Sequence, residues 1–385
     1  MTATVIQASR DTSDQSTETR RVRDVSKMLA YLEPDVAPLV TFMSRLRKKG
    51  ATDPKIEWFE DEALPRFDTL GASLSSGAST MTVNNFTRFR KDDLVLVNHL
   101  EVVLVTTTPT TTSVAIDRAF GDQSAVSASS GQQLRILSPA AEEGATRRDL
   151  LSTQKVPRYN FLQIFRDPYG ITKTAKATKT FAGKDWDNLQ REQLTEHKKS
   201  MEVAMLLGQR KEITSGTHPQ RATRGISTAI TTNVLNVAGD LSENVFDNFL
   251  RTGYRYGKKT KVAFCSPIVM QAINGFAKDK LRTMVGKKTY GVTLSRYENA
   301  GRIVLLHEHI AMTNDGLNDF DGIAGEAFVI DIADITMRYM NGRLTVHRTN
   351  IQDNSRDSRE DEHLTEAGLE AKRERWHSKL QGVTG

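Results

Sequence analysis

Two histidines in the carboxyl-terminal third of the chain are the residues whose spacing best suits metal chemistry. His307 and His309 lie two positions apart, so they share one face if residues 303–311 form a strand. Two imidazoles at this spacing could bind zinc, but a zinc site needs further ligands. No neighbouring residue has a recognisable ligand spacing, so we expect ordinary polar roles for both histidines.

The other residues that could do chemistry also lack the required context. The phosphate-binding loop requires G-x-x-x-x-G-K-[ST], and neither residues 253–260 nor residues 286–289 have this spacing. The chain has no serine nucleophile elbow, no H-E-x-x-H and no dinucleotide fingerprint. Cys265 lies in an apolar run, which favours a buried, inert thiol. The sequence therefore predicts no catalytic residue, no cofactor and no metal, and an enzyme of unknown mechanism is the least favoured alternative.

The composition is that of a polar globular protein. Of its 385 residues, 38% are hydrophobic and 26% are charged, enough for a large core and two or three domains. The net charge of +6 suits a partner with diffuse negative charge but does not establish nucleic-acid binding. A single cysteine excludes an internal disulfide framework and fits a reducing cytoplasm. The sequence has neither an apolar run of about 18 residues nor a secretory signal, so no membrane partner is expected.

A long amphipathic helix is predicted over residues 184–210, and the rest of the chain is organised around it. The segment has no proline and is rich in strong helix formers, with Asp185 as a candidate cap and Gly208 as a candidate stop. Its apolar residues recur mostly every three to five positions and predict a packing stripe of Trp186, Leu189, Leu194, Met201, Ala204 and Met205. Its wetter side is expected to hold Gln190, Arg191, Glu192, Lys198, Lys199 and Glu202.

Residues 80–137 differ in character from the chain on either side. Clusters of β-branched residues alternate with Asn, Asp, Thr, Pro and Gly, which predicts the short strands of a small all-β module. Because its neighbours in the sequence do not resemble it, we interpret the module as an insertion. Its charges alternate in sign, which suits a solvated exterior.

The second half of the chain mixes predicted helices and strands. Helices are expected at residues 241–252 and 266–277, each entered through a serine cap, with a short buried strand between them. An Asn-Gly dipeptide predicts a hairpin within residues 336–346. Residues 352–363 are highly charged and are expected to form a solvated loop. This mixture indicates an α+β protein.

Several short motifs around the long helix carry a resemblance to a known family. N-x-x-Q-I precedes the helix, E-x-A-x-x-x-G ends it, and Arg-Gly-Ile follows. The motif residues are Asn160, Gln163, Ile164, Glu202, Ala204, Gly208, Arg224, Gly225 and Ile226. A closing segment, residues 369–383, contains Leu-Glu-Ala, Trp-His and Leu-Gln-Gly-Val. In this order, over about residues 30–384, the chain resembles the major capsid protein of tailed double-stranded DNA phages. It departs from that pattern at Ser200 and Met201, where an acidic and an aliphatic residue are common.

The resemblance implies an α+β fold of the Hong Kong phage type with a small all-β insertion. Its expected parts are an N-terminal arm (1–49), an extended loop region (50–180) with the β insertion (80–137), the spine helix of a peripheral domain (181–214), an axial domain with some peripheral strands (215–327), and a C-terminal return to the peripheral domain (328–385).

The same resemblance implies a structural protein that self-assembles as pentamers and hexamers into an icosahedral phage head. Expected partners are double-stranded DNA on the inner face without sequence specificity, a separate scaffold protein or none, and candidate portal and decoration proteins. The expected location is the virion capsid, assembled in the host cytoplasm. An encapsulin-like nanocompartment shell protein is the alternative, because it resembles the same fold. The β insertion and the closing segment favour the phage capsid.

Overall fold

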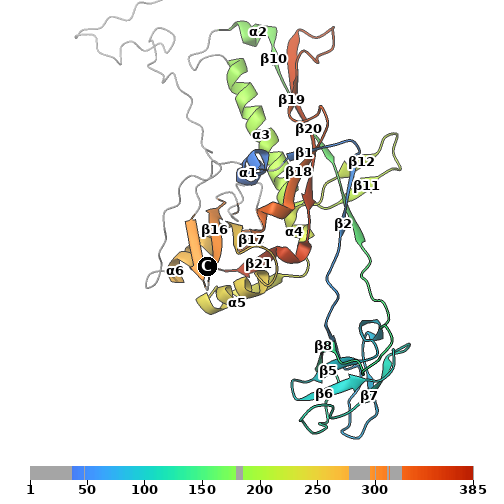
Figure 1. Ribbon diagram of the computed structural model, residues 1–385. Coiled ribbons are helices and arrows are strands. Elements are labelled where there is room, and N and C mark those ends of the chain that lie inside the picture. The colour runs from blue at the N-terminus through green and yellow to red at the C-terminus, as the bar shows by residue number, and fades with distance from the viewer. Residues whose placement is uncertain are drawn as a thin grey trace, which may run out of the picture. The chain divides into compact units, whose positions relative to one another are not determined.

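The computed structural model describes residues 37–46, 48–178, 185–276, 295–299, 301–309, 312 and 323–384. Most of the predicted arm, the first residue of the predicted long helix and residues 286–289 lie outside these ranges. The chain divides into two units (Figure 1). Unit 1 comprises Met1–Trp58 and Arg158–Gly385, and unit 2 comprises Phe59–Pro157. None of the described helices is long and apolar enough to cross a membrane.

Unit 1 contains a five-stranded sheet built around its longest strand. The strand order is β1 (Lys48–Ala51), β18 (Ile335–Met340), β20 (Ser358–Ala371) and β10 (Gln163–Thr172), and β19 (Val346–Arg348) pairs with β20 as well. β10 and β20 run antiparallel from the Gln163–Ala367 pair to the Thr172–Ser358 pair. β1 joins β18 in parallel.

Two predictions for this sheet are wrong. β18 and β19 do not form a hairpin with each other, because each pairs with β20 instead, although Gly342 has the positive φ of a turn. Residues 358–363 form the first part of β20 rather than a solvated loop. Their charges find partners within the sheet, such as Arg166 for Glu362 at 2.7 Å, so the strand is stable despite its polarity.

Helices cover one side of this sheet. α3 (Asp185–Leu207) packs along β10 and β20, and α1 (Pro38–Leu46) contacts both α3 and β18 (Figure 1). The long helix is therefore confirmed, with an end just before Gly208. The core between these elements includes Leu39, Met43, Phe165, Met201, Met205, Met337 and Leu369.

A six-stranded mixed sheet forms the other half of unit 1. Its strand order is β13 (Val234–Gly239), β21 (Ser378–Val383), β17 (Ala327–Ile330), β14 (Thr260–Cys265), β16 (Arg302–Glu308) and β15 (Ser295–Asn299). The two predicted helices are present as α5 (Glu243–Gly253) and α6 (Pro267–Phe276). Ser242 Oγ accepts from Val245 N at 3.5 Å, and Ser266 Oγ accepts from Val269 N at 3.4 Å, as expected for helix caps.

The remaining elements of the described chain are short. The pairs β2 (Lys55–Glu60) with β9 (Val156–Phe161) and β11 (Lys211–Ile213) with β12 (Gln220–Ala222) form two-stranded ribbons. The small helices are α2 (Lys173–Ala177), α4 (Ile226–Ala229), η1 (Phe86–Arg88), η2 (Ile332–Asp334) and η3 (Glu374–Trp376).

Unit 2 is a small closed β-barrel. Its strand order is β3 (Phe67–Thr69), β8 (Gln133–Pro139), β5 (Asp93–Val97), β6 (Glu101–Val105), β7 (Ser113–Asp117) and β4 (Thr80–Thr82). The first and last strands meet through a bridge between Leu70 and Val83, and Gly71 N donates to Thr82 O at 2.9 Å. Closure removes the free edges of the sheet.

The sequence-based bounds of the β module, residues 80–137, are too narrow. β3 lies outside them, yet it pairs with β8 and closes the barrel. Leu70 and Leu74 also lie outside them and are buried in the barrel core with Met81 and Val95. Apolar periodicity does not reveal these two leucines, because each is isolated among small polar residues.

Candidate functional site

Glu202 joins the long helix α3 to the first helix, α1. Its side chain is 0% exposed. Oε1 accepts a hydrogen bond from Leu39 N at 2.8 Å, and Oε2 accepts one from Val40 N at 2.7 Å. Both amides belong to the first turn of α1, where N–H groups have no partner within the helix. Glu202 therefore caps α1 from a distant part of the chain, and its negative charge suits the positive end of the helix dipole.

The expectation that Glu202 lies on the wetter side of the helix is wrong. The carboxylate is buried because α1 covers it and supplies donors, and His309 Nε2 lies 3.2 Å from Oε1. Apolar periodicity describes one helix without its packing partners, so a charged residue is assigned to the solvent side. The E-x-A-x-x-x-G motif marks the position of Glu202, although it gives no indication of its partners.

The residues of the predicted packing stripe of α3 show two degrees of burial. Trp186, Met201 and Met205 are buried, whereas Leu189 and Leu194 are half-buried. A histidine of the same helix is also buried on this side, as described below. The stripe is thus partly polar, and its polar members have specific partners.

Asn160, at the end of β9, is the centre of a second buried junction. Nδ2 donates to Thr223 Oγ1 and Arg224 O at 3.1 Å and to Leu369 O at 2.6 Å. Oδ1 accepts from Phe161 N at 2.9 Å and from Arg224 N at 2.8 Å. One amide side chain, 2% exposed, therefore joins β9, the segment after β12 and β20, and all of its polar positions are used.

Two glycines let the backbones at this junction come into contact. Gly225 N donates to Gly208 O at 2.8 Å. A Cβ on Gly225 would lie 2.7 Å from Gly208 N and from Leu206 O, and a Cβ on Gly208 would lie 2.6 Å from Thr223 O. These distances are shorter than any normal contact, so only glycine fits at either position.

Five of the nine motif residues named above lie together at this junction. Gln163 Oε1 accepts from Thr223 N at 3.2 Å, so Asn160, Gln163, Gly208, Arg224 and Gly225 adjoin one another. Burial lowers the pKa of the Arg224 guanidinium, and neighbouring arginines lower it further. Glu202 belongs to the other junction, with α1. The motifs therefore describe two contacts of α3, one with α1 and one with the strands at its end.

A cluster of histidines, missed in the sequence, holds α3 against the ribbon of β10 and β20. His197 of α3, His347 of β19 and His363 of β20 gather around Tyr169 of β10. The ring centroid of His363 lies 6.1 Å from that of His197, 5.2 Å from that of His347 and 5.3 Å from that of Tyr169. These residues are far apart in the sequence, so no spacing could reveal the cluster.

Most polar atoms of this cluster are paired, whereas the buried Nε2 of His363 has no hydrogen-bond partner among the described residues. His197 Nδ1 lies 2.5 Å from Asp167 Oδ2, and its Nε2 lies 2.7 Å from Thr365 Oγ1. His347 Nε2 lies 2.7 Å from Tyr169 Oη and 3.3 Å from a carboxylate oxygen of Asp361. Burial lowers the pKa of His363 below its usual range, and the adjacent His347 and His197 lower it further.

The stability of the subunit should fall when the pH drops below about 6.5, the usual pKa of histidine. The unfolded chain then binds a proton at His363 that the folded protein excludes, so the stabilisation is complete above that pH and is lost as the pH falls toward the folded pKa. His363→Phe keeps an aromatic ring and should reduce this dependence. Urea unfolding between pH 7.5 and pH 5, with the exposed His218→Gln variant as control, measures it. An unchanged slope in His363→Phe would contradict the assignment. The buried His377, whose pKa is also lowered, accounts for part of the remaining slope.

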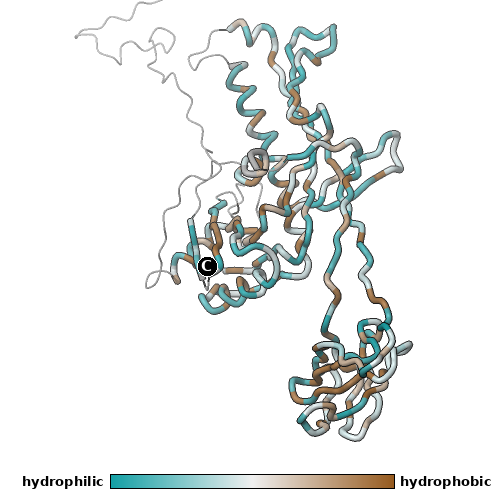
Figure 2. Tube along the Cα trace, viewed as in Figure 1, coloured by the Kyte–Doolittle hydropathy of each residue, from teal (hydrophilic) through white to brown (hydrophobic). Residues whose placement is uncertain are grey.

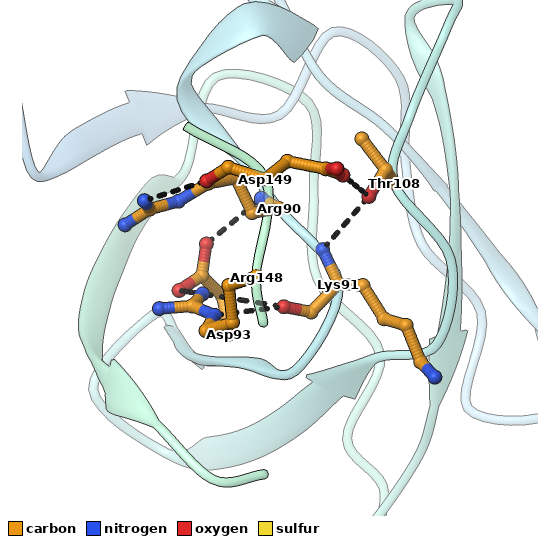
Figure 3. A network of polar contacts seen from close by, with 6 residues as sticks. All are labelled: Arg90, Lys91, Asp93, Thr108, Arg148 and Asp149. Atoms are coloured by element: carbon orange, nitrogen blue, oxygen red, sulfur yellow. Dashed lines mark hydrogen bonds and ion pairs between the residues drawn. The ribbon is translucent and has the colours of Figure 1, made fainter. Parts of the chain in front are cut away.

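A polar network in unit 2 fixes the chain where it leaves the barrel (Figure 3). It consists of Arg90, Lys91, Asp93, Thr108, Arg148 and Asp149. Arg148 contacts the buried Asp93 at 2.5 Å and donates to Lys91 O at 3.2 Å. Thr108 Oγ1 donates to Asp149 Oδ2 at 2.5 Å. The segment that leaves the barrel is thereby tied to two of its loops.

Arg148→Met should lower the stability of unit 2 by about 2–3 kcal/mol, because it leaves the buried carboxylate of Asp93 without its cation. The partial exposure of Arg148 keeps this value below that of a fully buried pair. Thermal unfolding followed by circular dichroism measures the loss, and Arg147→Met, at the exposed neighbouring position, is the matched control. Equal melting temperatures for the two variants would show that the ion pair is dispensable.

The residues considered for metal or nucleophilic chemistry have structural surroundings. His309 contacts Glu202, and His307 packs edge-on against Phe264 with ring centroids 5.7 Å apart. Cys265 is buried, which raises the pKa of its thiol to about 12. In the part of the chain that the structure describes, no group of three or more His, Cys, Asp and Glu could hold a metal ion.

A buried lysine and the closing segment form a further structural site that the sequence did not predict. Lys261 Nζ donates to Gly253 O at 2.7 Å, to Tyr256 O at 3.1 Å and to Trp376 O at 2.5 Å. Burial lowers its pKa to about 8. His377 Nδ1 accepts from Asp331 N at 3.1 Å. The Trp-His pair of the closing segment thus accepts hydrogen bonds from Lys261 and from the backbone after β17.

Sequence comparisons find a family model that matches nearly the whole chain. The chain matches the family described as SU10 major capsid protein over residues 5–384. The major capsid protein of Pseudomonas phage PaMx41 is 24% identical over 247 residues, which cover 60% of this chain and 57% of that protein. The matched region therefore spans little more than half the length of this curated relative.

The capsid of a GTA particle has a similar fold. The capsid of an empty GTA particle matches with a TM-score of 0.52 and 10% identity, over 98% of this chain and 100% of that chain. The SrpI encapsulin of Synechococcus elongatus PCC 7942 matches with a TM-score of 0.44 and 10% identity, over 60% of this chain and 78% of that chain. The α+β capsid fold expected from the resemblance is confirmed. The family match extends over nearly the whole sequence, and this chain belongs to the SU10 major capsid protein family.

Proposed function

We propose that copies of this chain assemble as pentamers and hexamers into an icosahedral phage head that encloses double-stranded DNA. Membership of a major capsid protein family supports the role of shell subunit. The observation that carries the proposal is apolar surface on an extended segment that the described part of this chain leaves exposed.

The exposed surface lies along the segments that enter and leave unit 2. Phe59 is 72% exposed and Leu150 is 86% exposed, and Leu64 and Val156 are exposed as well. The adjoining ribbon of β2 and β9 has only two strands, and such a ribbon is marginally stable in water on its own. Its outer edges and apolar side chains suit burial against another protein. In a shell, neighbouring copies would supply that cover.

The distribution of charge supports an orientation of the subunit in the shell. Residues 59–157 contain 12 acidic and 9 basic residues, a net charge of −3, so the rest of the chain carries +9. DNA repels negative surfaces through its phosphates. We therefore place unit 2 on the outside and unit 1 toward the DNA, with phosphate contacts that do not depend on base sequence.

The finer organisation of the family resemblance belongs to the same proposal. α3 would be the spine helix of a peripheral domain, residues 215–327 would supply most of the axial domain, and residues 328–385 would return to the peripheral domain. The proposal includes a separate scaffold protein, or none, with portal and decoration proteins as further partners. It places assembly in the host cytoplasm and the product in the virion capsid. The match to a phage capsid family favours this function over an encapsulin-like compartment.

Hydrogen exchange in shells and in dissociated subunits tests the proposal. Amides of residues 55–64 and 148–161 should exchange at least about tenfold more slowly in the shell, because neighbouring copies cover them. Amides of β14, a buried strand at the centre of its sheet, should exchange alike in both states and provide the internal control. Equal exchange of the exposed segments in both states would contradict the proposed cover.

A further inference from the structure

The barrel of unit 2 has strands that are apolar on both faces. On β5 and β6 the residues that point inward, such as Val95 and Val103, are 0% exposed. The residues between them point outward and are also apolar, and they are only half-buried: Leu94, Leu96, Val102 and Leu104. A strand with one face in water normally alternates between apolar and polar residues. Brown residues accordingly follow one another along the strands of this unit (Figure 2).

The register brings these outward residues together. Leu94 lies opposite Leu104, and Leu96 lies opposite Val102, so the four form a square on neighbouring strands. Phe67 and Leu137 extend the apolar surface across β3 and β8, with exposures of 57% and 38%. We call the surface made of Phe67, Leu94, Leu96, Val102, Leu104 and Leu137 the outer wall.

Two opposite charges flank the square at symmetrical positions. Arg135 of β8 lies opposite Leu96 on one side, and Asp117 of β7 lies opposite Leu104 on the other side. Both side chains are exposed, and neither makes an ion pair with another described residue of this chain. The outer wall therefore carries a base and an acid on either side of an apolar centre.

We propose that the outer wall binds the outer wall of a second copy of this chain across a two-fold axis. A two-fold interface is self-complementary: if one residue contacts another, the reverse contact exists as well. If the axis exchanges the positions of Arg135 and Asp117, the arginine of each copy lies opposite the aspartate of the other copy. With strands about 4.8 Å apart and alternate residues about 6.8 Å apart, this axis passes close to Leu94 and Val102. Each of these two residues would then meet its own counterpart in the other copy.

This inference rests on the proposed function, because a shell is what brings copies of unit 2 side by side. The inference specifies one contact between copies in that shell by its surface, its symmetry and its ion pairs. The charge pattern favours a second copy over an unrelated partner, because one wall already holds both members of the pair. A separate protein seated on the wall would keep two walls apart.

Cysteine cross-linking in the assembled full-length protein tests the contact. Cys265 is buried and its pKa is raised, so an introduced cysteine is the reactive one. A short bismaleimide is the reagent, because packed sheets lie about 10 Å apart, too far for a disulfide. Val102→Cys and Leu94→Cys should give a covalent dimer on a denaturing gel. Thr110→Cys, on an exposed loop of the same barrel, should give little or none.

Charge reversal tests the pairing itself. In the Val102→Cys background, Arg135→Asp or Asp117→Arg alone should reduce the dimer yield several-fold. The double variant should restore it, because the pair is then reversed and not removed. Single reversals without effect, or a double variant no better than either single one, would overturn the pairing.

The two proposals fail in different ways. Shells that form normally but give no dimer with either cysteine would overturn the outer-wall contact and leave the shell function intact. Absence of shells would overturn the shell function. In that case the yield of cross-linked dimer is measured on the soluble protein. A dimer there supports the outer-wall contact alone, and its absence overturns that contact too.

Discussion

Glu202→Gln should lower the free energy of unfolding by about 2–4 kcal/mol, although it changes only one atom in the side chain. The amide has one oxygen for two backbone donors, so it loses one of the charge-assisted hydrogen bonds to α1 and turns an N–H group toward another N–H group. It also removes the negative charge from the positive end of the α1 dipole. Because Glu202 is completely buried, water cannot replace the lost partner.

Urea unfolding of the dissociated subunit measures this loss, and limited proteolysis shows where it acts. Cleavage within α1 should become faster, because Glu202 holds its first turn. Glu192→Gln, on an exposed position of the same helix, is the matched control and should behave as the wild type does. Wild-type stability in Glu202→Gln would mean that the cap contributes little.

Asn160→Asp should lower the free energy of unfolding by about 3–5 kcal/mol, because it buries a charge without a partner. The substitution replaces an amide nitrogen that donates to three oxygen atoms with a carboxylate oxygen that cannot donate. A buried negative charge would then face the carbonyl oxygens of Arg224 and Leu369 without a cation at hydrogen-bond distance. Because β9, β20 and the end of α3 meet here, the three elements should separate together.

Urea unfolding measures this loss, and soluble yield and near-ultraviolet circular dichroism show whether the three elements stay packed. Asn354→Asp, the same change at an exposed position, should leave both unchanged. If Asn160→Asp gave soluble protein with the wild-type spectrum and urea midpoint, the junction would not be the point on which these elements depend.

The sequence was most informative where local chemistry decides the structure. Composition and apolar spacing predicted α3, and Gly208 marked its end, because the approach of Thr223 O leaves no room for a side chain. The serine caps of α5 and α6 could also be predicted, because a cap and its helix are adjacent in sequence. The motif positions could be named in advance, although their arrangement in two junctions could not.

The sequence was least informative where the partner of a residue is far away along the chain. Glu202 was assigned to the solvent side because α1, which covers it, lies 163 residues earlier. The charged first part of β20 was taken for a loop because its partners are on other strands. The extent of the barrel was underestimated because its closure depends on the isolated apolar residues Leu70 and Leu74.

Negative-stain electron microscopy of the purified protein shows whether the chain forms shells. Large closed shells of uniform curvature are expected, because the exposed segments around unit 2 are buried only when many copies surround one another. Small particles the size of a monomer or dimer, under conditions where the subunit is folded, would contradict the proposed assembly.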